Sequence, residues 1–171
     1  MNNLPLFVSE SKNDTESVWG GMPWAKIASG DPGERCPHCD RFLKTYNRRI
    51  IARVGVGLIR LYQLSIEFPD RRYFHVTDIK GASFGGDFAK LRFYGLIKEM
   101  PNDDVEKKSS GKWEITELGI AFVENRLQVP KYCVIKWNSE HIGFAGEMVG
   151  IRTVIEYRNQ FNYQQLMYDN N

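Results

Sequence analysis

Hydrophobic residues recur at helical spacing between Lys44 and Glu67. Plotted at about 100° per residue, the apolar side chains of this segment gather on one side and its arginines lie in a narrow arc on the other. The apolar members are Ile50, Ile51, Val54, Leu58, Leu61 and Tyr62, and the arginines are Arg49, Arg53 and Arg60. The pattern predicts one basic helix packed on a core. Phe68 ends it, because a residue before proline avoids the helical region.

Beyond this helix the pattern predicts two more helices, a hairpin and a closing helix. Thr77 is expected to cap a short helix that Gly81 ends. The next helix, residues 83–97, buries Phe84, Phe88 and Leu91, while Ala89, Lys90 and Phe93 face outward. The expected hairpin strands are Leu96–Met100 and Lys112–Thr116, and Thr116 is expected to cap the closing helix.

The two ends of the chain differ from this central part. Residues 1–35 are expected to form an arm, because "SESKNDTES" is polar and lacks periodicity and "GDPGER" is typical of a turn. Between them lies "VWGGMPWAKI", whose two tryptophans favour docking on the core or on a partner. Residues 128–171 alternate in the manner of a β-hairpin, followed by a short helix near 149–157. We therefore expect an α+β fold in three parts: the arm 1–35, a central domain 36–127, and a C-terminal extension 128–171. Trp113 and Trp137 are expected to pack under the two hairpins.

The charge is unevenly distributed along the chain. Residues 41–100 carry 12 basic and 5 acidic groups, whereas residues 1–40 carry 3 and 6, and residues 101–171 carry 8 and 10. A basic centre between acidic flanks favours a surface for a polyanion, and the alternative is a solvated helix face. There is no apolar run long enough to span a membrane and no signal-peptide pattern at the start, so we expect a cytoplasmic protein without a membrane partner.

Cys36 and Cys39 have the spacing of half a structural zinc site. Such a site takes four Cys or His ligands, and the other candidates, His75, Cys133 and His141, are remote in sequence. The interpretations are zinc completed by remote ligands, zinc shared by a homodimer, a turn without metal, and a redox pair. The last lacks the usual thioredoxin-like pattern. Cys133 lies in an alternating strand and is expected to be a core thiol.

Sequence motifs for catalysis are absent. There is no phosphate-binding Gly-rich loop ending in Lys-Ser or Lys-Thr, no nucleophile elbow and no His-Glu-X-X-His. We therefore expect a protein that is not an enzyme.

The stretch "LRFYGLI" followed by "WEITELGIAFVEN" resembles the winged helix-turn-helix superfamily. The matching residues are Leu91, Gly95, Leu96, Ile97, Trp113, Thr116 and Gly119. The whole chain is similar to small phage-encoded proteins that place a Cys-Pro-X-Cys element before a basic helix and a winged-helix core. The residues carrying that likeness are Cys36, Pro37, Cys39, Tyr46, Arg48 and Arg49.

The resemblance implies that duplex DNA is a partner and that the protein has a regulatory or accessory role. The helix near 83–94 would face the bases with Ser83, Gly85, Gly86, Asp87 and Lys90, with Arg92 at its edge. Wing lysines Lys107, Lys108 and Lys112 would meet neighbouring phosphate, and backbone charge would be neutralised by Arg49, Arg53, Arg71 and Arg72. Asp87 and the lack of Arg, Asn and Gln on this face favour weakly specific binding. The alternative is a module that binds protein and inhibits or redirects a host complex.

Overall fold

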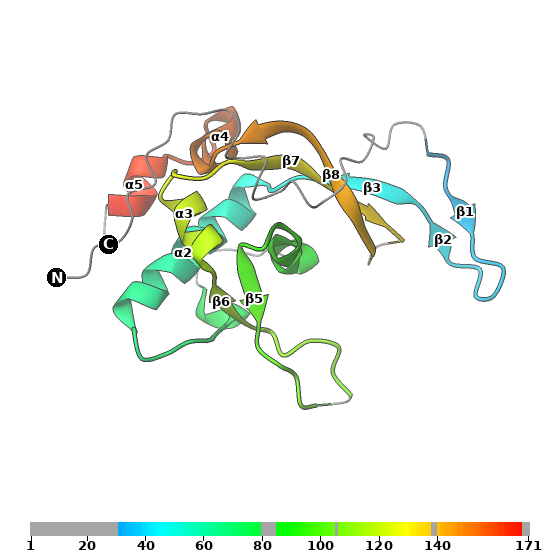
Figure 1. Ribbon diagram of the computed structural model, residues 1–171, viewed down its shortest axis with the longest axis horizontal. Helices are drawn as coiled ribbons and strands as arrows, with labels where there is room; N and C mark the ends of the chain where they lie inside the picture. The colour runs from blue at the N-terminus through cyan, green and yellow to red at the C-terminus, as the bar shows by residue number, and fades with distance from the viewer. Residues whose placement is uncertain (1–30, 80–84, 105, 138–139, 169–171) are drawn as a thin grey trace.

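The computed structural model describes residues 31–79, 85–104, 106–137 and 140–168, so most of the expected arm lies outside the described part. The described chain is a mixed α+β fold with two three-stranded antiparallel sheets and a separate small hairpin (Figure 1). The longest helix of the described chain, α2 (Ala52–Glu67), lies between the two sheets and contributes to the hydrophobic core.

Helix α2 spans Ala52–Glu67, and it begins eight residues later than the apolar periodicity predicted. The segment before it forms strand β3, Thr45–Arg48, which pairs antiparallel with strand β7. Arg49 therefore precedes the helix, and the prediction that it lies on the helix was wrong. Ile51 is the extended residue before the first turn. The expected end before Pro69 is confirmed.

The buried residues of α2 include part of the predicted stripe and extend beyond it, since Val56 and Ile59 are buried as well. Val54, Leu58 and Leu61 are buried, and Leu58 and Leu61 are completely inaccessible to solvent. Ile51, which the wheel placed on the same face, is 37% exposed because it lies outside the helix. Gly55 lets the helix approach the C-terminal region closely, since a Cβ there would lie 2.9 Å from Ile155 Cδ1.

After α2 come short elements that form the first three-stranded sheet and its helices. They are β4 (Phe74–His75), the 3-10 turn η1 (Val76–Asp78), the 3-10 helix η2 (Gly85–Tyr94), β5 (Ile97–Glu99), β6 (Lys112–Ile115) and α3 (Glu117–Val123). The sheet order is β4–β6–β5, and both pairings are antiparallel. The predicted hairpin and its closing helix are confirmed, and Trp113 is buried in edge-to-face contact with Phe88.

The short turn after β4 has its cap two residues earlier than predicted. His75, and not Thr77, is the capping residue: its Nδ1 accepts a hydrogen bond from the backbone N–H of Thr77, and the Asp78 carboxylate accepts one from the backbone N–H of His75. This reciprocal arrangement satisfies two N–H groups that a helix start leaves without partners.

The second three-stranded sheet contains β3 and the predicted C-terminal hairpin, in the order β3–β7–β8. The remaining elements are β7 (Val129–Lys136), β8 (Glu140–Val149), α4 (Ile151–Ile155), the 3-10 turn η3 (Tyr157–Asn159) and α5 (Tyr163–Tyr168). The short helix expected near 149–157 is confirmed as α4, whereas α5 was not predicted. Cys133 is fully buried, as expected, but Trp137 is 41% exposed and does not pack under the hairpin.

The second sheet packs against η2 of the first half. The Tyr94 hydroxyl donates a hydrogen bond to the Arg48 carbonyl at 3.1 Å, and its ring lies 5.3 Å from that of Phe144. Phe93 lies against His141 of β8, with ring centroids 5.3 Å apart. The prediction that Phe93 faces outward from η2 was wrong. The C-terminal strands cover that side of η2. Packing the apolar ring of Phe93 against them is favourable because it removes apolar surface from water.

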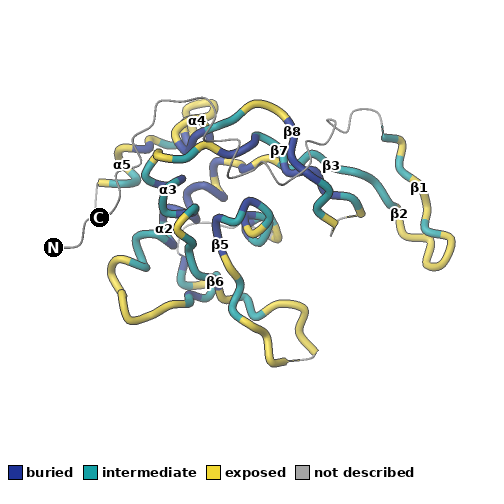
Figure 2. Tube along the Cα trace, viewed as in Figure 1, coloured by how far each residue is buried: buried dark blue, intermediate teal, exposed yellow. Residues whose placement is uncertain are grey.

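The burial pattern shows where the core lies (Figure 2). Dark blue segments run through α2, η2, β7 and β8, while the β1–β2 hairpin and the β5–β6 loop are largely exposed. The hairpin, built from β1 (Glu34–Arg35) and β2 (Phe42–Leu43), stands away from the main body at one end of the molecule (Figure 1).

Candidate nucleic-acid interface

A groove of about 660 Å³ opens where α2 begins. Its walls come from four regions of the chain: the start of α2, strands β7 and β8, helix α4, and the turn after it. The lining residues that carry charge are Arg49, Arg53, Lys131, Glu147 and Arg158. Four cations therefore face one carboxylate in a concave surface, and such a surface concentrates anions by its field.

Two arginines of the groove flank the ring of Tyr157. The Arg49 guanidinium lies 4.7 Å from the ring centroid and that of Arg158 lies 5.2 Å away. A hydrogen bond from the Arg49 side chain, together with the charges of Arg158 and Arg49, lowers the pKa of the Tyr157 hydroxyl below its usual value. The aromatic ring and the two guanidinium groups thus offer both a stacking face and positive charge to a ligand.

The turn that carries Arg158 is held in an uncommon backbone conformation. Arg158 and Asn159 have φ angles of 58° and 54°, which lie in the left-handed region that residues with a side chain rarely adopt. Backbone strain of this kind persists only where the surrounding structure imposes it, and it is concentrated at functional sites. Here it returns the chain so that Arg158 lies beside Tyr157.

Of the two remaining cations of the groove, Lys131 is paired with a carboxylate and Arg53 is not. The Lys131 ammonium donates to Glu147 at 2.7 Å, and this carboxylate raises the pKa of Lys131. Arg49, Arg53 and Arg158 have no carboxylate partner in the part of the chain that the structure describes. Helix α2 also starts here without a side-chain cap or an acidic residue in its first turn, so its partial positive charge adds to that of the arginines.

Most of the other predicted DNA contacts are engaged in ion pairs. Arg71 pairs with Asp78, Arg72 with Glu114, Lys90 with Asp87, Arg92 with Glu99 at 3.8 Å, and Lys107 with Asp104 at 3.0 Å. Lys108 and Lys112 are exposed on the β5–β6 hairpin, and Ser83 lies outside the described residues. The pairs of Arg71 and Lys107 are the more exposed of these, and exposed ion pairs are worth little, so Arg71 and Lys107 can exchange a carboxylate for a phosphate.

The structure brings Arg49 and Arg53 together and leaves the wing lysines in a different region, on the β5–β6 loop (Figure 1). Lys131 and Arg158 join the first group, and sequence reasoning missed both. They come from β7 and η3, which follow α2 by many residues, and nothing in the local pattern of either segment relates it to α2.

The exposed part of η2 is its first turn and one edge. Gly86 is exposed, and a Cβ built on it would meet no atom within 4 Å. Arg92 is also exposed, whereas Phe88, Leu91 and Tyr94 are buried. Because β8 covers Phe93, the first turn of η2 and the edge that carries Arg92 are the parts of this helix that a large ligand can reach.

The Cys36–Cys39 element forms the tight turn of the β1–β2 hairpin. Backbone hydrogen bonds of 2.9 Å join Cys36 N–H to the Arg41 carbonyl and Asp40 N–H to the Cys36 carbonyl. Hydrogen bonds to its sulfur from the backbone of His38 and Cys39 lower the pKa of Cys36. Among the described residues, no group of three Cys, His, Asp or Glu side chains is placed to hold a metal ion.

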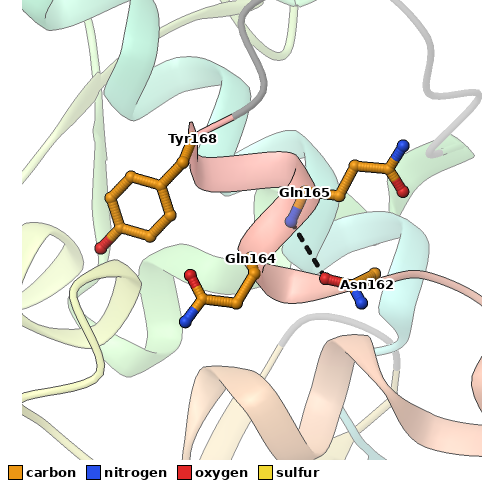
Figure 3. A pocket seen from close by; sticks show the side chains of 4 residues that line it. All are labelled: Asn162, Gln164, Gln165 and Tyr168. Carbon is orange, nitrogen blue, oxygen red and sulfur yellow. Dashed lines mark hydrogen bonds between the residues drawn. The ribbon is translucent and has the colours of Figure 1, made fainter.

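A second hollow, of about 500 Å³, lies on α5. Figure 3 shows its lining, and the side chains of Gln164, Gln165 and Tyr168 point away from the helix in different directions. The Asn162 side-chain oxygen accepts a hydrogen bond from Gln165 N–H at 3.0 Å, so it caps the helix. Because its side chains are uncharged and diverge, this hollow is a weaker candidate than the cationic groove.

Comparisons of the chain with protein-family models, curated proteins and solved structures found no match. In the described residues, no helix combines the length and hydrophobicity needed to cross a membrane.

Proposed function

We propose that this protein is a winged-helix DNA-binding protein, without enzymatic activity, that holds duplex DNA mainly through phosphate contacts. The order α2, β4, η1, η2, β5, β6, α3 supports the proposal most directly. Strand β4, which follows α2, pairs antiparallel with β6, the second strand of the expected wing, and so joins the first helix to the hairpin. The phage-type resemblance remains a prediction from sequence.

The shape of η2 suggests how the duplex is engaged. The first turn of η2, around Gly86, allows close approach of a backbone, and the exposed Lys108 and Lys112 extend from the neighbouring hairpin. The covered side of η2 restricts how deeply the helix can enter a groove of DNA. We therefore infer weakly specific binding in which phosphate contacts dominate.

The cationic groove at the start of α2 supplies a second cluster of phosphate contacts. Its three arginines without a carboxylate partner carry charge that is not neutralised within the described chain. Arg53 is exposed, and no hydrogen bond or ion pair ties its guanidinium to another described residue, so it can turn toward a phosphate. This geometry supports the role predicted for Arg49 and Arg53, which is to contact the phosphate backbone of the DNA.

Fluorescence anisotropy of a labelled duplex, titrated with protein at low and moderate salt, tests the proposal. Each lost phosphate contact is expected to reduce the slope of log affinity against log salt by roughly 0.9. The double variant Arg53→Gln/Arg158→Gln probes the groove, and Lys108→Gln/Lys112→Gln probes the wing. Arg126→Gln, an exposed arginine paired with Glu124, is the control for loss of charge. Absence of binding at low salt contradicts the proposal.

A protein-binding function is the second candidate, and the exposed aromatics at one end of the molecule favour it. Phe42 is 47% exposed and Trp137 is 41% exposed, and the chain segments that carry them are joined by a 3.1 Å hydrogen bond from Trp137 N–H to the Lys44 carbonyl. A stoichiometric host partner that survives nuclease treatment and is lost in Trp137→Ala would favour this function, provided that DNA binding is also absent.

A further inference from the structure

Cys36 and Cys39 lie in one tight turn at the tip of the β1–β2 hairpin. Strands β1 and β2 pair over only two residues each, yet the turn between them is well defined by the two backbone hydrogen bonds across Cys36–Arg41. Asp40 adopts a φ of 57°, and the Arg35 guanidinium donates to the Asp40 carbonyl at 2.9 Å, which ties the end of the turn to the strand.

Both sulfurs belong to this one turn, and the backbone is arranged around them. The Asp40 N–H donates to the Cys36 carbonyl at 2.9 Å, so the residues from Cys36 to Asp40 close into one turn that holds both cysteines. Cys39 is exposed and Cys36 is half-buried, so the pair is accessible to a soft divalent cation.

In its described residues, the chain places no third Cys, His, Asp or Glu ligand beside Cys36 and Cys39. It has three cysteines and three histidines, none of them in residues 1–30. Cys133 is fully buried in the core. His75 caps a turn, and His141 donates to the Gly143 carbonyl at 2.9 Å while lying between the rings of Phe93 and Phe144. His38, although adjacent, does not form a group of three with the two cysteines.

Two further cysteine ligands are available on a second copy of the chain. The hairpin stands away from the main body in Figure 1, so its turn can meet another such turn without a clash between the two cores. We propose that Cys36 and Cys39 of two copies bind one zinc ion through four sulfurs and thereby join the chains into a dimer. Zinc prefers four-coordinate sulfur sites of this kind.

The local charge suits this site. Each thiol loses its proton on binding, so four thiolates and one Zn²⁺ carry a net charge of −2. Arg35 and Arg41 belong to the same hairpin, and the Arg35 guanidinium is already paired with Asp40 at 2.9 Å. Arg41 of each copy therefore supplies positive charge that offsets the two negative charges of the site. The inference does not depend on DNA binding.

Zinc content and molar mass of the purified full-length protein, measured together under reducing conditions, test the proposal. We expect one zinc per two chains and a dimer by light scattering. A chelator should release the metal and give monomers, and added zinc should restore the dimer. Replacement of zinc by cobalt should give the intense sulfur-to-metal absorption of a four-thiolate site.

Variants distinguish a zinc site shared by two chains from a site within one chain. Cys36→Ser/Cys39→Ser should bind no zinc and remain monomeric, with the same thermal unfolding of the core as the parent protein. His38→Ala, at the exposed residue between the two cysteines, should keep both zinc and dimer. One zinc per chain in a monomer, no zinc at all, a dimer that survives chelation, or loss of zinc in His38→Ala would each overturn the proposal.

Discussion

The hydroxyl of Thr116 donates a hydrogen bond of 2.6 Å to the carbonyl oxygen of Gly95, 21 residues earlier in the chain. The hydroxyl oxygen of Thr116 also accepts a hydrogen bond from the backbone N–H of Gly119 at 3.0 Å, and the N–H of Thr116 donates to the Leu96 carbonyl at 3.1 Å. One side chain thus caps α3 and fixes the end of η2, where Gly95 turns with a φ of 67°. These contacts explain physically why threonine and two glycines occupy the positions on which the winged-helix resemblance rests.

Replacement of Gly119 by alanine should destabilise the fold. A Cβ at this position would lie 2.1 Å from the carbonyl oxygen of Leu96, and backbone cannot move aside as a flexible side chain does. We expect the free energy of unfolding, measured by urea denaturation, to fall by about 1–3 kcal/mol. Gly86→Ala is the matched control, since it meets no atom within 4 Å and should change stability by less than about 1 kcal/mol. Equal stability of the two variants would contradict this.

Removal of the Thr116 hydroxyl should weaken both contacts of that side chain. We expect Thr116→Ala to lower the free energy of unfolding by about 0.5–2 kcal/mol, the usual cost of losing a helix cap. Thr116→Ser keeps the hydroxyl and should recover most of the loss. If serine were no better than alanine in thermal or urea unfolding, the methyl group and not the hydrogen bonds would be responsible.

Stability at alkaline pH should depend on Tyr62. Its hydroxyl donates to Glu124 at 2.8 Å, and burial together with this carboxylate raises the pKa of Tyr62 to about 12. A folded pKa above the unfolded value of about 10 means that the stabilisation is complete below pH 10 and is lost as the pH rises toward 12. Tyr62→Phe should cost about 1 kcal/mol at neutral pH and show a weaker alkaline decline in urea unfolding.

The carboxyl partner responds in the opposite direction. Burial opposes ionisation of Glu124, but hydrogen bonds from Tyr62 and Arg126 outweigh it and hold its pKa below the usual value. Its contribution is therefore present above the ordinary carboxyl pKa and is lost as the pH falls. An unchanged pH profile in Tyr62→Phe, at both ends, would show that this pair does not contribute.

The groove can be probed through Tyr157 without any ligand. Arg49→Met removes the hydrogen bond and the charge that lower the pKa of Tyr157, so that pKa should rise toward its ordinary value of about 10. Nuclear magnetic resonance of the tyrosine ring carbons over a pH titration measures it. Arg126→Gln leaves the groove intact and should leave the titration of Tyr157 unchanged. A similar titration in both variants would mean that Arg49 does not contact the ring in solution.

The three thiols should separate into two classes. Burial raises the pKa of Cys133 to about 12 and excludes reagents, whereas Cys36 and Cys39 are accessible on the hairpin. After chelation, two thiols per chain should react rapidly with a thiol reagent at neutral pH and the third only on unfolding. Cys133→Ala should abolish the slow class. Three fast thiols in the native protein would contradict the placement of Cys133.

The sequence predicted the elements whose partners are close along the chain. The β5–β6 hairpin and the helix capped by Thr116 are confirmed because alternation, turn residues and a cap are local properties. The start of α2 was wrong because Thr45–Arg48 has acceptable helical periodicity, but β7 provides it with a strand partner. That partner is distant in the sequence, and local propensity yields to the pairing.

The sequence by itself determined the α+β class, the positions Val54, Leu58 and Leu61 on the buried face of α2, and the core position of Cys133. Periodicity and composition suffice for these features because each depends on burial of one face of one element. Only the tertiary structure decided that β8 covers one side of η2 and that Lys131 and Arg158 join Arg49 and Arg53 in one groove. Contacts between distant segments arise from packing of whole elements, and no local pattern of residues encodes them.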